Sequence, residues 1–208
     1  MTTFITGACY KISLCAFSLG FILNTVQGAT VTPPEFTQLV KEADYVVRAV
    51  VKSVDVVEKA NHGQRVMPYS LVEMEVKQVI VGTPPRPLIL EVLGGKVGDR
   101  EMFISGAPKF TVGEEAVFFV QGNHTQIFPL ARMMHGLYPI RKEATTGREY
   151  VARSNGEPMA NTSEVSQPMR EVGVSVAQIT AQAKQALTPD NFATQIRAAA
   201  KVLRANEK

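Results

Sequence analysis

Apolar and polar residues alternate over most of the stretch 43–121, and this period of two constrains the fold more than any other feature of the chain. Successive side chains of a strand point to opposite faces, so the pattern predicts strands that bury one face. Gly and Pro residues separate the apolar runs at short intervals. Short strands with such punctuation are typical of a mainly β domain, built as a sandwich or as a small barrel.

The first strand, which begins at Tyr45, carries apolar residues on both of its faces. Its odd-numbered residues from 45 to 51 share one face, and Val46 and Val50 lie on the other. This predicts a strand that is covered on both sides for part of its length. The alternation breaks over 53–57, which predicts a bulge or a bend.

Charged residues occupy the outward faces of the first two strands. They are candidate contributors to a binding surface, because small barrels bind partners through an exposed strand face. These residues are Arg48, Lys52, Glu73, Glu75 and Lys77. Glu73 and Glu75 share a face with Lys77, which is typical of a solvated surface rather than of an acid–base pair.

The Gly and Pro residues that separate the remaining apolar runs predict a β domain over 29–153. Its further strands are expected at 69–81, 88–93, 101–105, 116–120 and 125–131, followed by a hairpin of 136–141 with 148–153. The short spacing of these strands is consistent with a meander that closes on itself.

Helical periodicity flanks the β domain. Pro33-Pro34-Glu35 opens a short helix whose apolar residues recur at i, i+3 and i+4. The segment 154–170 is rich in Asn, Gly, Pro and Ser, and it predicts a linker or an edge loop. Two narrow, alanine-rich apolar stripes then predict a helical segment at 171–208. These stripes leave open whether the helices dock on the β domain or on a partner.

Residues 1–28 have the pattern of a secretory signal peptide. Lys11 precedes an apolar run at 12–23, which is too short to span a bilayer and is typical of a signal-peptide core. A polar tail with small residues follows, so we predict cleavage between Gly28 and Ala29. A buried helix or a retained anchor over the same residues is the alternative.

Both cysteines, Cys9 and Cys15, lie in this leader. The mature chain is therefore predicted to lack disulfides, thiolate metal sites and nucleophilic thiols. Exported eukaryotic domains of this size usually carry disulfides, so we expect a bacterial periplasmic or secreted protein that leaves no membrane anchor after cleavage. The formal net charge is +3, and no basic run is interleaved with aromatic residues, which argues against nucleic-acid binding.

Three segments of the strand block carry a resemblance to a known family. They are Ala43-Asp44 leading into 46–49, Val76-Lys77-Gln78-Val79, and 112–117. With these segments, the chain resembles the netrin-like or TIMP-like branch of the OB fold over 33–141. It is also similar to uncharacterised exported bacterial proteins that carry a Gly-Pro-Phe-Gly-Glu-like run, here 106–110 and then Gly113-Glu114. The resemblance implies an OB-like small barrel with an N-terminal short helix and two C-terminal helices.

The function implied is that of an exported, non-enzymatic protein that binds a protein or another macromolecule. Its specific form is regulation or inhibition of a secreted protease. Metalloproteinase inhibitors of this family use a mature N-terminal cysteine, which this chain lacks after cleavage. That mechanism is not carried over, and no site residue of the family has a counterpart here. No serine-nucleophile elbow is present either, so we expect neither catalysis nor a cofactor.

Met133-Met134-His135 is the alternative candidate site. Thioether and imidazole groups are soft ligands that suit Cu(I), so the runner-up prediction is a periplasmic copper- or zinc-binding protein. Adjacent methionines on a strand would point to opposite faces, however, and filling of the core is the usual role of methionine. His62, His124 and His135 have neither the i, i+4 nor the i, i+2 spacing of a metal-binding pair.

Overall fold

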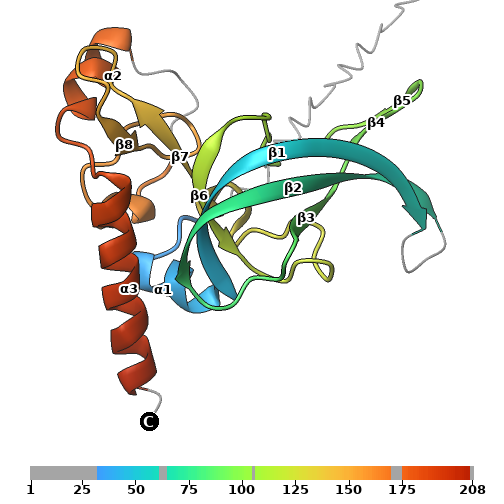
Figure 1. The fold of residues 1–208 in the computed structure, drawn as a ribbon, viewed down its shortest axis with the longest axis horizontal. Helices are drawn as coiled ribbons and strands as arrows, with labels where there is room; N and C mark the ends of the chain where they lie inside the picture. The colour runs from blue at the N-terminus through green and yellow to red at the C-terminus, as the bar shows by residue number, and fades with distance from the viewer. Residues whose placement is uncertain (1–31, 61–64, 105, 170–174, 207–208) are drawn as a thin grey trace, which may run out of the picture. The chain divides into compact units, whose positions relative to one another are not determined.

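The computed structural model describes residues 32–60, 65–104, 106–169 and 175–206, which belong to one compact unit, Val31–Lys208 (Figure 1). The predicted leader and its cleavage point at Gly28 and Ala29 lie outside the described residues, as does His62. Within the described ranges, no helix is both long enough and apolar enough to cross a bilayer.

The unit is mainly β, with one N-terminal helix and two C-terminal helices, as the periodicities predicted. An antiparallel sheet of six strands has the order β3-β2-β1-β6-β7-β8. Its strands are β1 (Tyr45–Ala60), β2 (Val66–Val81), β3 (Leu88–Leu93), β6 (Glu115–Val120), β7 (Leu137–Lys142) and β8 (Glu149–Val151). Over the described residues no ladder joins β3 to β8, so the sheet is open.

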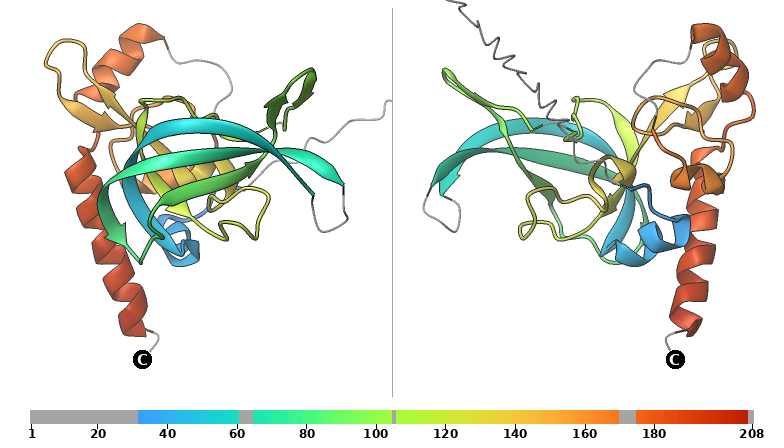
Figure 2. Two further views of the ribbon diagram at one scale, coloured as in Figure 1. Left: turned by 45° about the vertical axis from the view of Figure 1, so that its right-hand side comes forward. Right: turned by 180° about the vertical axis from the view of Figure 1, so that it is seen from behind.

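Shorter elements surround this sheet. They are α1 (Phe36–Glu42), the hairpin of β4 (Gly95–Val97) with β5 (Arg100–Met102), the 3-10 helices η1 (Met133–Gly136) and η2 (Thr162–Ser166), α2 (Val176–Ala183) and α3 (Pro189–Asn206). The helices gather toward one end of the long β1–β2 hairpin, and the other end reaches away from them (Figures 1 and 2).

The two longest strands, β1 and β2, form a curved hairpin. The irregularity expected over 53–57 lies just before that stretch, because the register with β2 shifts between Val51 and Ser53 and is regular from Ser53 to Ala60. The ladder between β1 and β6 covers only Tyr45 to Val50. Beyond the bulge, the far half of β1 therefore pairs with β2 alone within the described ranges.

Each face of the sheet buries its own hydrophobic core, which confirms that β1 is covered on both sides. The odd-numbered residues of β1 from Tyr45 to Val51 join a core inside the curl of the sheet, with residues of β2, β3, β6 and β7. Val46 lies on the opposite face, in a core that also contains Phe119 of β6 and residues of α1 and α3. The alternation of side chains along the strands thus places successive residues in two separate cores, one on each face of the sheet.

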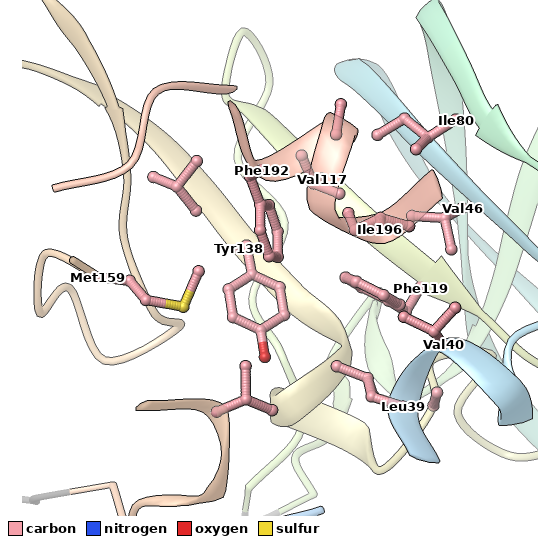
Figure 3. Close-up of a cluster of buried hydrophobic side chains, with 14 of the residues drawn as sticks. Leu39, Val40, Val46, Ile80, Val117, Phe119, Tyr138, Met159, Phe192 and Ile196 are labelled. Carbon is pink, nitrogen blue, oxygen red and sulfur yellow. The ribbon is translucent and has the colours of Figure 1, made fainter. Parts of the chain in front are cut away.

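Helix α3 docks on the second of these faces, which settles how its apolar stripe is used. Phe192 and Ile196 are fully buried and point toward Phe119 and Tyr138 (Figure 3). The ring centroids of Phe192 and Tyr138 are 5.1 Å apart. Thr188 caps the start of this helix, since its hydroxyl accepts a hydrogen bond from the Asn191 N–H at 3.2 Å.

Helix α2 packs less extensively than its apolar stripe suggested. Of its residues, only Ala183 is buried, and Val176 is 80% exposed. The Arg148 guanidinium beside β8 donates to the carbonyl oxygens of Ala183 and Ala186, which terminates the helix with a cation at its negative end. The helix is thus held at its C-terminal end.

The prediction of a strand at 125–131 is wrong. This segment makes turns and contributes one isolated bridge, between Leu130 and Val120. The Asn123 side chain binds the outer edge of β3 by donating to the Ile89 carbonyl at 2.7 Å and accepting from the Glu91 N–H at 3.1 Å. An asparagine amide offers the same donor and acceptor pair as a peptide group, so it replaces a neighbouring strand here.

The segment 154–170, expected to be a linker or an edge loop, contributes to the core through its described residues. Met159 and Val165 are buried among the side chains that contact α1 and α3. The Met159 N–H also donates to the Val151 carbonyl at 3.0 Å. The segment is therefore rich in polar residues and is nevertheless anchored in the core by two apolar side chains.

Candidate functional site

Met133, Met134 and His135 lie on η1 rather than on a strand, because the backbone turns sharply before them. Arg132 and Met133 both have left-handed φ values, of 54° and 56°. A Cβ placed on Gly106 would lie 3.4 Å from the Met134 methyl carbon and 3.9 Å from that of Met133. The two thioether side chains thus converge on one backbone position, which corrects the expectation that they would diverge.

Structural contacts explain this turn. Arg132 donates two hydrogen bonds to the Glu42 carboxylate of α1, at 2.8 and 2.6 Å. Gly136 approaches the backbone so closely that a Cβ there would lie 2.6 Å from the Ala131 carbonyl oxygen. A strained backbone conformation of this kind persists where the surrounding contacts hold it in place. In this turn, one contact joins Arg132 to α1 and the other packs Gly136 against the Ala131 carbonyl.

His135 is buried, with 3% of its surface exposed, and its Nδ1 has no hydrogen-bond partner within the described residues. Burial lowers the pKa of this imidazole below its usual value, and the charges of Arg153 and Arg132 lower that pKa further. The surroundings therefore favour the neutral form of the side chain. The described ranges contain no cluster of three or more His, Cys, Asp or Glu side chains that could hold a metal ion.

This burial makes the stability of the protein dependent on pH. Between about pH 6.5 and the lower pKa of His135 in the folded protein, the unfolded chain binds more protons at this residue than the folded protein does, so the free energy of unfolding falls as the pH falls, by up to about 1.4 kcal/mol per pH unit. Replacing the residue, as in His135→Gln, should remove this part of the pH dependence. Urea unfolding at pH 7.5, 6.5 and 5.5 tests this prediction. If the free energy of unfolding changes equally with pH in the wild type and in the variant, the prediction is contradicted.

The cations proposed from the sequence as part of a binding surface are all paired with carboxylates of the sheet. Arg48 contacts Glu115 at 2.5 Å and Glu149 at 2.8 Å. The other pairs are Lys52 with Glu73 at 2.7 Å and Lys77 with Glu75 at 2.6 Å. The charges of these side chains are thus matched inside the sheet, which leaves little net attraction for a charged ligand.

A groove that sequence reasoning did not identify lies between α3 and the end of β2. Its volume is about 450 Å³, and it is lined by Val79, Ile80, Val81, Gly82, Arg197, Ala200, Lys201 and Arg204. The β2 residues and Ala200 give it an apolar floor, and its rim is basic. No carboxylate, imidazole, thiol or hydroxyl side chain lines the groove, so its chemistry suits anion binding rather than proton transfer or nucleophilic attack.

The three cations of the groove follow from the helical period. Arg197, Lys201 and Arg204 stand at i, i+4 and i+7, so they share one face of α3, beside the buried stripe of Ile196 and Ala200. All three are exposed. Over the described residues, none of them forms an ion pair or a side-chain hydrogen bond. The spacing of these cations was the sequence signal that could have identified the site.

No protein-family model matches the chain, and no curated protein matches it either.

Proposed function

We propose that this chain is an exported, non-enzymatic binding protein whose groove between α3 and β2 takes an acidic segment of a partner protein. The observation that carries the proposal is the row of three exposed cations over an apolar floor, none of them paired within the described ranges. Elsewhere on the sheet, the strand charges pair with one another. Unpaired cations that lie close together attract and orient an anionic partner.

The spacing of the cations suits an extended peptide. A helix rises 1.5 Å per residue, so Arg197 and Lys201 are about 6 Å apart along the axis, and Arg204 lies about 10 Å from Arg197. Side chains on one side of an extended strand recur about every 7 Å. Carboxylates at alternate positions of such a segment therefore match the spacing of Arg197 and Lys201, and its intervening apolar side chains can contact the floor that includes Val79.

We also propose that the open sheet is an OB-type barrel. The central position of β1, between β2 and β6, supports this, as does the core enclosed by the curl of the sheet. Export rests on the predicted leader at 1–28. Regulation of a secreted protease is the specific role suggested by the family resemblance, and the acidic segment would then belong to that enzyme. Copper or zinc binding at Met133, Met134 and His135 remains the alternative prediction.

A charge-neutralised groove tests the proposal. The variant Arg197→Gln/Lys201→Gln/Arg204→Gln should bind a peptide of alternating Glu and apolar residues about 10–100-fold more weakly than the wild type, since exposed pairs contribute up to about 1 kcal/mol each. Fluorescence anisotropy at low and high salt measures this, and salt should weaken wild-type binding.

A matched control separates the groove from net charge. Lys96, Lys109 and Lys184 are exposed and do not line the groove, so their combined change to Gln removes the same charge elsewhere. This control should retain most of the affinity. Equal losses in both variants would mean that the peptide responds to overall charge, and the absence of binding by the wild type would refute the proposal.

A further inference from the structure

The far half of β1, from Ser53 to Ala60, has an open edge within the described residues. The last contacts on the side toward β6 are those of Val51, which donates to Glu114 at 3.0 Å and accepts from Gly113 at 2.8 Å. Beyond this point, the ladder of β1 is with β2 alone. This half of the hairpin reaches away from the helices (Figures 1 and 2).

The hydrogen bonds of β2 show which peptide groups of β1 face the open edge. The Pro68 carbonyl accepts from the Gly94 N–H at 2.9 Å, so Pro68 turns its peptide groups toward β3. Its partner across the ladder, Glu58, therefore turns its N–H and C=O away from β2. Every second residue does the same. The outward-facing residues are Val54, Val56, Glu58 and Ala60.

We propose that a second copy of this chain pairs antiparallel with this edge, about a two-fold axis at Val57. Outward residues must oppose outward residues, which limits the register to a few choices. With the axis at Val57, Asp55 lies opposite Lys59 of the second copy, and symmetry gives this pair twice. An axis at Glu58 would oppose two carboxylates, each paired with Arg100 of its own chain, and would make no pair between the copies. An axis at Val56 would make no such charge pair either.

The charges on this edge favour a second copy over an uncharged strand. Asp55 is exposed, and its carboxylate accepts a hydrogen bond from the nearby Ser53 hydroxyl at 3.0 Å. Lys59 contacts Glu91 at 2.5 Å and is still 44% exposed. Charged side chains discourage edge pairing unless the incoming strand supplies opposite charges, which this self-complementary register does. The contact is short, so we expect a weak dimer that forms at high protein concentration.

Charge reversal tests the pairing by sedimentation velocity over a wide concentration range. Asp55→Lys and Lys59→Asp each place like charges opposite one another twice, so each should weaken dimerisation about tenfold or more. The double variant should restore it. Lys77→Asp reverses an exposed lysine on β2 that pairs with Glu75, and it should have no effect. Circular dichroism confirms that each variant is folded.

Hydrogen exchange gives a second measurement. The amides of Val56 and Glu58 should exchange more slowly as the protein concentration rises, and the amide of Val57, which faces β2, should not change. The proposal would be overturned if the wild type is a monomer at every concentration, or if neither single reversal weakens the dimer. It would also be overturned if the double variant is folded but stays monomeric. The groove variants test a separate surface, so their result does not decide this one.

Discussion

Replacing Phe192 with alanine should lower the free energy of unfolding by about 3–5 kcal/mol, which is the usual cost of deleting a fully buried aromatic ring. Phe192 is 0% exposed. Its ring centroid lies 6.1 Å from Phe36, 6.1 Å from Phe119 and 5.1 Å from Tyr138. One side chain thus joins α3 to α1 and to the sheet, and its removal leaves a cavity between all three.

Urea denaturation measures this loss, and an exposed phenylalanine supplies the control. Phe103 is 70% exposed, so Phe103→Ala should change stability by no more than about 0.5 kcal/mol. The Phe192 variant should also bind acidic peptides more weakly, because α3 carries the basic rim of the groove. Equal stability changes for the two variants would contradict the packing of α3 on the sheet.

Replacing Gly82 with alanine should cost about 2–5 kcal/mol, because two effects add. Gly82 has a φ of +77°, which strains any residue with a side chain. A Cβ there would also lie 2.4 Å from the Asp44 carbonyl oxygen and 2.7 Å from the Tyr45 Cβ, so the backbone must move. This glycine ends β2 against the start of β1 and lines the groove.

A second glycine separates the cost of backbone strain from the cost of a steric clash. Gly147 has a φ of +70°, and a Cβ there would meet nothing within 4 Å. Gly147→Ala should therefore cost only the conformational penalty, about 1–2 kcal/mol. Thermal or urea unfolding of both variants compares them directly. Similar losses at the two positions would mean that the close approach at Gly82 relaxes without cost.

The layered packing of the sheet was predictable because it follows from local periodicity. The alternation around Tyr45 and Val46 indicated two buried faces, and both carry a core. The break in alternation over 53–57 indicated a bulge, and the register shifts just before that stretch, between Val51 and Ser53. The stripe containing Phe192 predicted the buried face of α3, and its docking surface was left open since an apolar stripe does not specify its partner.

Other features depend on contacts that sequence spacing does not encode. The strand expected at 125–131 was wrong because the edge of β3 is satisfied by the Asn123 side chain and by the Ile127 carbonyl, which accepts from the Leu93 N–H, rather than by a strand ladder. Met133 and Met134 converge on Gly106 because of consecutive left-handed residues, which are rare outside glycine. The groove combines the end of β2 with α3, and these segments become neighbours only through the tertiary fold.

Chemical-shift mapping is the most direct test of the central claim, that the groove binds acidic segments. Isotope-labelled protein is titrated with the peptide of alternating Glu and apolar residues. We expect the largest amide shifts at 79–82 and along α3 from Arg197 to Arg204, and we expect these shifts to vanish in the variant with all three groove cations changed to Gln. Shifts concentrated on the far half of the β1–β2 hairpin, or no shifts at high peptide concentration, would contradict the proposed site.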